Sequence, residues 1–125
     1  MDETTPAAIA TVARLIDAIE RGDTEAAAAC YTEDARIWHN FDDADQTREE
    51  NLAVLAWMCR TFPERRYEIR RRELIADGVF QQHVLHLVSR EGERHAVPAC
   101  LVVECAGDRI RRVEEYMDPT PFAPA

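Results

Sequence analysis

Apolar residues recur at helical spacing near the start of the chain. Ile9, Val12, Ile16 and Ile19 lie three or four positions apart and predict an amphipathic helix, which Gly22 can end in a left-handed conformation. The alanine-rich segment 24–31 predicts a second, short helix that packs against the first. Segment 35–40, ARIWHN, is β-branched and aromatic and predicts a short strand, and an acidic loop at 41–46 follows it.

A third helix is predicted from Thr47 and Glu50, which have the spacing of a capping box, to Pro63, which stops it. Beyond residue 66 the pattern changes to strands separated by the turn signals ADG, REGE and AGD. Helices followed by an antiparallel meander predict an α+β domain with the helices on one side of a curved sheet.

The segment AVPACLVV, residues 96–103, is apolar on both strand faces. An antiparallel strand of this kind meets water on neither side, whereas helices cover only one side. We therefore expect a second copy of the chain to cover the other side, giving a homodimer through the sheet. Pro98 interrupts this strand and is expected to form a bulge that bends it.

Length and charge narrow the class of protein. The chain of 125 residues is the size of one domain, and its formal net charge of −9 argues against nucleic acid and anionic membranes as partners. No apolar run is long enough to span a bilayer, and the start of the chain lacks the pattern of a signal peptide. We expect a cytoplasmic protein. No metal-binding spacing and no glycine-rich loop occur in the sequence, so neither a metal nor a cofactor is expected.

Two adjacent carboxylates, Glu114 and Glu115, lie in the last predicted strand and must point to opposite faces. Glu115 shares its face with Val113 and Met117, which is the more apolar of the two. Loss of solvation raises the pKa of a carboxyl group into the range that general acid or base catalysis needs near neutrality. An ion pair with an arginine at the sheet rim is the alternative role for Glu115.

Other candidate residues come from the middle of the chain. Trp38 and Asn40 share one strand face and offer an aromatic wall and an amide, a common pair in small-molecule pockets, although a core tryptophan and a turn asparagine would look the same. His83 and His86 point to opposite strand faces and cannot hold one metal ion together. Either of them could face a pocket as an acid or base, and the sequence does not decide which.

Taken together, the chain resembles the SnoaL-like branch of the nuclear transport factor 2-like (cystatin-like) superfamily. The resemblance spans about residues 6–118. Its most specific parts are the turn YTEDA at 31–35 and a terminal pattern formed by Gly107, Ile110, Arg112, Glu115, Tyr116 and Asp118. It implies a cone-shaped α+β fold with three N-terminal helices on a curved antiparallel sheet, one SnoaL-like domain over 1–125, and irregular ends at 1–5 and 119–125.

The resemblance also implies a deep, mostly apolar pocket in a dimer, with an inward acid on the last strand at the position of Glu115. Members of the superfamily include polyketide cyclases, ketosteroid isomerases, dehydratases and limonene-epoxide hydrolases. The epoxide hydrolases hold a water between two acids, with an arginine and an aspartate on a middle strand. Here the matching positions are His83 and Leu85, so the second acid is missing.

Three hypotheses follow. The first is an acid/base enzyme, a cofactor-independent cyclase, isomerase or dehydratase (lyase), that acts on a small apolar ligand bearing a carbonyl or hydroxyl group. In it Glu115 and His83 are catalytic, and the ligand contacts are Trp38, Asn40, Trp57, Leu85 and Cys100. The second is a non-catalytic dimeric module for ligand binding or protein interaction, with Glu115 locked by an arginine. The third is a hydrolase like the limonene-epoxide hydrolases. Substrate and reaction type are beyond the sequence.

Overall fold

Local capping signals set the ends of the helices in the computed structural model, which describes residues 4–122. The helices are α1 (Ala7–Arg21), α2 (Thr24–Ala29) and α3 (Arg48–Thr61). Gly22 ends α1 at φ 72°, a left-handed conformation that glycine adopts without strain. The Asp23 side chain accepts a hydrogen bond from the Ala26 amide and caps α2. Both hydrogen bonds of the predicted capping box, between Thr47 and Glu50, are present at the start of α3.

Six strands form one sheet in the described chain, in the order β2-β1-β6-β5-β4-β3. They are β1 (Tyr31–His39), β2 (Ala44–Thr47), β3 (Glu64–Ile75), β4 (Gly78–Val88), β5 (Arg94–Ala106) and β6 (Arg109–Met117). The strands β3 to β6 form the predicted antiparallel meander, and β1 runs parallel to β6. A 3₁₀ turn, η1 (Thr120–Phe122), follows β6. These elements confirm the expected α+β class.

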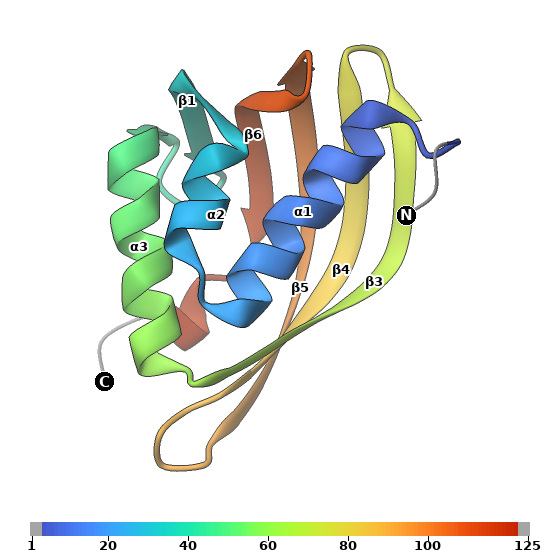
Figure 1. Ribbon diagram of the computed structural model, residues 1–125. Coiled ribbons are helices and arrows are strands. Elements are labelled where there is room, and N and C mark those ends of the chain that lie inside the picture. Colours follow the sequence, from blue (N-terminus) through green and yellow to red (C-terminus); the bar gives the residue numbers. More distant parts are fainter. Residues whose placement is uncertain (1–3, 123–125) are drawn as a thin grey trace.

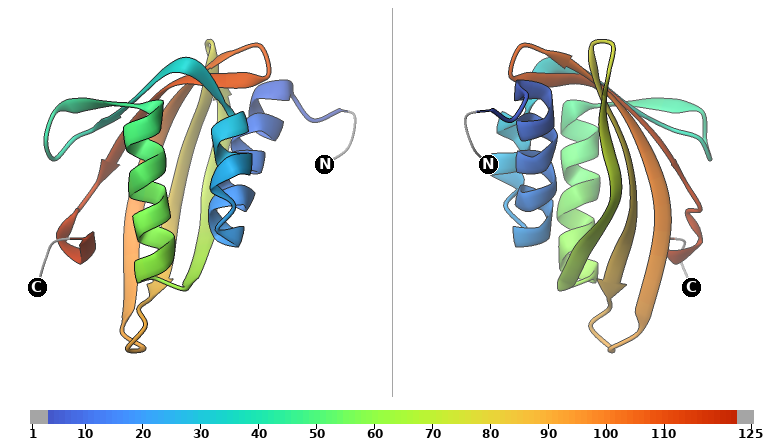
Figure 2. Two further views of the ribbon diagram at one scale, coloured as in Figure 1. Left: turned by 60° about the vertical axis from the view of Figure 1, so that its left-hand side comes forward. Right: turned by 90° about the vertical axis from the view of Figure 1, so that its right-hand side faces the viewer.

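The three helices lie on one face of the curved sheet, and no helix of the described residues covers the opposite face (Figures 1 and 2). We call the helix-covered face the inner face and the opposite one the outer face. Inner-face positions alternate along β4, where Val79, Gln81, His83, Leu85 and Leu87 are buried. They pack with the apolar stripe of α1, in which Val12 is fully buried. Among residues 4–122, no helix is long and apolar enough to cross a membrane.

Two expectations about the strands are wrong. Part of the expected acidic loop forms β2, an edge strand paired with β1, because Asp43 takes a positive φ of 52° that turns the chain back. Pro98 forms no bulge, and β4 and β5 pair without a shift of register. β6 pairs with β5 only from Ala99 onward, so Pro98 lies where β5 has no partner on that side and the missing amide proton is tolerated.

Candidate active site

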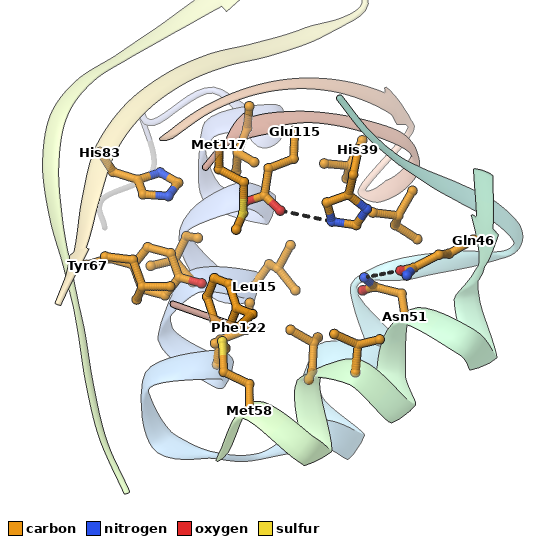
Figure 3. Close-up of a pocket in the computed structure, with 18 of the residues that line it drawn as sticks. Leu15, His39, Gln46, Asn51, Met58, Tyr67, His83, Glu115, Met117 and Phe122 are labelled. Carbon is orange, nitrogen blue, oxygen red and sulfur yellow. Dashed lines mark hydrogen bonds and ion pairs between the residues drawn. The ribbon is translucent and has the colours of Figure 1, made fainter. Parts of the chain in front are cut away.

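A cavity of about 160 Å³ lies between the helices and the inner face of the sheet. Most of its walls are apolar, with Leu15, Leu85 and Leu101 among them. Seven polar or ionisable residues also line it: Tyr31, His39, Gln46, Asn51, Tyr67, His83 and Glu115. Figure 3 labels all of them except Tyr31. An apolar cavity of about 150 Å³ holds a benzene-sized molecule, so this one has room for a ligand of about one six-membered ring.

Glu115 and Met117 extend from β6 into this cavity (Figure 3). Val113 lines it from the same face of β6. Strand alternation therefore places Glu115 as the sequence indicates. Its carboxylate Oε1 is 3.0 Å from Nε2 of His39, and 23% of the Glu115 side chain is exposed. The two residues are direct partners in the register of β1 and β6, which brings their side chains together on the inner face. No arginine pairs with Glu115 in the described chain.

His39 is 7% exposed, and its Nδ1 is buried without a hydrogen-bond partner among residues 4–122. A protonated imidazole would bury an unsatisfied N–H at Nδ1, which is costly. A neutral ring that carries its proton on Nε2 leaves only a bare lone pair at Nδ1. His39 is therefore best satisfied as a neutral donor to an ionised Glu115, whose other oxygen remains available to a ligand.

His83 lines the cavity from β4 and is 3% exposed. Its Nδ1 lies 2.9 Å from the side-chain nitrogen of Gln81, and its ring meets the Tyr67 ring edge-on at 4.9 Å. Burial lowers the pKa of His83, the nearby charge of Glu115 works against this shift, and Arg72 adds to it. The result is a neutral imidazole close to the carboxylate. His86 lies on the outer face and pairs with Glu68 at 2.9 Å, so the structure resolves which histidine faces the cavity.

The two tyrosines keep their protons. Burial raises the pKa of Tyr31 and of Tyr67, and the charge of Glu115 raises both further. The Tyr31 hydroxyl donates to Asn51 at 3.3 Å, and the Asn51 amide donates to Gln46 at 3.1 Å. The cavity thus combines one carboxylate with several neutral hydrogen-bonding groups.

Three expected ligand contacts are corrected by the structure. Trp38 and Asn40 lie on the opposite side of β1 from Ile37 and His39 and do not line the cavity. Trp38 donates to Asp43 at 2.8 Å, while the Asn40 side chain accepts a hydrogen bond from the Met117 amide at 2.9 Å. Residue type suggested this pair, but alternation along β1 places it on the face opposite the buried Ile37 and His39.

Cys100 is the third correction, because it lies beside a hollow of the outer face. It pairs with Tyr116 and Gln82, whose side chains point to that face too. Trp57 and Leu85 do line the inner cavity, as expected.

Several cavity residues were not expected from the sequence. In the sequence His39 stands beside a predicted loop, where a solvated side chain is the simplest expectation, but its place two residues after Ile37 puts it on the buried face. Asn51 is a polar residue on the packed face of α3, and Tyr67 precedes the basic segment 70–72, RRR, so no sequence signal marked either one. No group of three or more His, Cys, Asp or Glu residues within 4–122 is placed to hold a metal ion.

Comparison with known proteins assigns the chain to a family. The sequence model of the SnoaL-like domain matches residues 12–113. No curated protein matches the chain.

Solved structures share the fold at low sequence identity. A protein described as a SnoaL-like polyketide cyclase from Shewanella denitrificans is 16% identical, with a TM-score of 0.80 over 94% of this chain and 95% of that one. A protein with a ketosteroid isomerase-like fold from Catenulispora acidiphila is 18% identical, with a TM-score of 0.75 over 85% and 83%. An LEH-like epoxide hydrolase from M. tuberculosis is 19% identical, with a TM-score of 0.77 over 91% and 84%. These solved structures share the fold whose helices and sheet enclose the inner-face cavity. Because the SnoaL-like domain model matches residues 12–113, the chain belongs to the SnoaL-like domain family.

Proposed function

We propose that the protein is a cofactor-independent acid/base enzyme that moves a proton on a small, largely apolar ligand bearing a carbonyl or hydroxyl group. The observation that carries the proposal is the carboxylate of Glu115, which faces an apolar cavity and has the imidazole of His39 as its partner at 3.0 Å. The alternative role considered for Glu115, an ion pair with an arginine, is not formed in the described chain.

In the proposed step, Glu115 removes a proton from the carbon next to the ligand carbonyl. Negative charge then develops on the carbonyl oxygen, and a donor on the cavity wall stabilises it. His83 supplies this donor, and His39 holds the Glu115 carboxylate in place. Aldol cyclisation, isomerisation and dehydration each begin with such a proton transfer, so the step fits all three.

Hydrolysis of an epoxide by a water held between two acids is not favoured. Glu115 is the single carboxylate among the residues that line the cavity in the described chain. Leu85 stands on the middle strand where the second acid would be needed, and it contributes an apolar wall.

The experiment is solvent exchange in D₂O, in which NMR follows the α-protons of small cyclic ketones and hydroxy-ketones. We expect the protein to accelerate exchange and Glu115→Gln to reduce the rate by about 10²-fold or more. Glu114→Gln is the matched control, because it makes the same change in charge one residue away, where Glu114 pairs with Arg112. Its rate should stay within about twofold of wild type.

Equal rates in wild type and Glu115→Gln would remove Glu115 from the chemistry. Binding of these ketones by wild type without any exchange would identify a ligand-binding module instead. Titration of the ligands against both variants separates these outcomes, since Glu115→Gln keeps the shape of the cavity.

A further inference from the structure

An irregularity in β3 turns one arginine of a basic segment toward the inner face. The register of β3 and β4 shifts between Ile69 and Arg71, so that Arg70 is an extra residue on the β3 side. Such a bulge reverses the parity of every side chain that follows it. Arg72 consequently lies beside Gln81, its direct partner on β4, and donates from Nε to the Gln81 side-chain oxygen at 2.7 Å.

The hydrogen bonds of Gln81 have only one consistent arrangement. A guanidinium only donates, so the Gln81 atom that faces Arg72 is the carbonyl oxygen. The other atom is then the NH₂ group, which also only donates and lies 2.9 Å from Nδ1 of His83. Nδ1 must accept this bond and cannot carry a proton, so the proton of a neutral His83 is on Nε2.

Burial makes this arrangement hard to change. Gln81 is fully buried and His83 is 3% exposed, so water cannot replace a bond that is lost. Among residues 4–122, His39 Nδ1 is the one sealed side-chain nitrogen or oxygen without a partner. Nε2 of His83 is therefore not sealed off, and His83 is among the residues that line the cavity.

We propose that Gln81, held by Arg72, is a positioning residue that fixes His83 as a neutral donor through Nε2–H. This inference rests on the proposed function and narrows its substrate class. A neutral N–H donor recognises an acceptor oxygen, and in the proposed step that acceptor is the carbonyl oxygen of the ligand. His83 then stabilises the developing enolate without giving up a proton. Glu115 then carries the proton alone.

The first experiment needs no substrate. Nitrogen NMR of the full chain with ¹⁵N-labelled histidine distinguishes the two neutral tautomers and the imidazolium, and His83→Gln identifies which of the four histidine signals belongs to His83. We expect wild type to show the Nε2–H tautomer at neutral pH. A wild-type signal of the Nδ1–H tautomer, or of the imidazolium, would overturn the inference.

Substitutions test whether Gln81 and Arg72 fix this state. Gln81→Met removes the donor, and Arg72→Met frees the amide to rotate, so both should give a mixture of tautomers. Gln81→Glu places an acceptor beside Nδ1 and should move the proton onto it. Arg71→Met is the matched control, because Arg71 forms an exposed ion pair with Glu73, and it should leave the His83 signal unchanged. If His83 kept its wild-type nitrogen signal in a folded Gln81→Met or Arg72→Met variant, the positioning role would be overturned.

Ketone exchange then separates this inference from the proposed function. We expect Gln81→Glu to lower kcat about 10-fold or more with a smaller effect on KM, while Arg71→Met keeps wild-type rates. If wild type catalyses no exchange but its tautomer responds to the substitutions, the positioning role stands and the proposed function fails together with its substrate class. If wild type accelerates exchange but the His83 tautomer is unchanged by substitution of Gln81 or Arg72, this inference alone fails.

Discussion

Replacing Arg65 with methionine should destabilise the protein strongly, because this guanidinium fastens the C-terminal ends of two helices. It donates to the carbonyl oxygens of Ile19 and Glu20 in α1, each at 2.9 Å. It also donates to those of Cys59 and Phe62 at the end of α3, at 3.3 Å and 2.8 Å. Carbonyls at helix ends have no partner within the helix, and the negative end of the helix dipole favours a cation there.

The size of the effect follows from these four bonds. A hydrogen bond to a charged group contributes about 1.5–3 kcal/mol, so four sealed bonds would contribute about 6–12 kcal/mol. Arg65 is only half-buried, so water can reach its acceptors after substitution, and each loss approaches the contribution of about 1 kcal/mol of an ordinary hydrogen bond. We therefore expect the free energy of unfolding to fall by about 3–4 kcal/mol. Methionine retains the apolar stem, so this figure excludes lost packing.

Urea and thermal unfolding, followed by circular dichroism, measure this loss. A change of 3–4 kcal/mol corresponds to a decrease in Tm of about 10–15 °C for a chain of this size. Arg66→Met is the control, since the neighbouring Arg66 is exposed and its substitution should change stability by less than about 0.5 kcal/mol. If Arg65→Met lay within about 1 kcal/mol of Arg66→Met, the role assigned to the guanidinium would be refuted.

Three further predictions concern other parts of the molecule. Gly78→Ala should lower the free energy of unfolding by at least about 3 kcal/mol, because a Cβ there would lie 1.7 Å from the Val103 carbonyl oxygen. Gly92→Ala has open space around it and should lose only about 1–2 kcal/mol, from the strain of its φ of 84°. Equal losses of the two variants in chemical denaturation would contradict this. Burial lowers the pKa of His83 below its usual 6.5, so on acidification the unfolded chain takes up this proton first and stability should decline below about pH 6.5. In urea titrations at successive pH values, His83→Gln should make the free energy of unfolding depend less steeply on pH. An unchanged dependence would contradict the role assigned to His83. We also propose a homodimer through the outer face, where Tyr116 is 48% exposed. Light scattering should give the mass of a dimer for wild type and of a monomer for Tyr116→Glu. A monomeric wild type would contradict the proposal.

Part of the site follows from strand parity alone. Glu115 and Val113 face the cavity, as alternation along the last strand indicates. The same rule applied to residues 36–40 separates Ile37 and His39 from Trp38 and Asn40, but it does not say which pair faces inward. Choosing by residue type selected the wrong pair, because an aromatic ring and an amide serve equally well on an outer face.

Other parts of the site had no local signal. The pairing of His39 with Glu115 depends on the parallel register of β1 and β6, two strands far apart in the chain. The inward turn of Arg72 depends on a bulge that no residue in the basic segment announces. Asn51 is buried because β2 supplies Gln46 as its partner, and β2 itself was expected to be a loop.

The sequence by itself determined the helices, the meander and the direction of Glu115, because caps, turns and side-chain periodicity act between residues close together in the chain. Only the tertiary structure decided the partner of that carboxylate, the protonated nitrogen of His83 and the residues that close the cavity. Each of these depends on the register between strands, and register is set by the packing of the whole sheet against the helices.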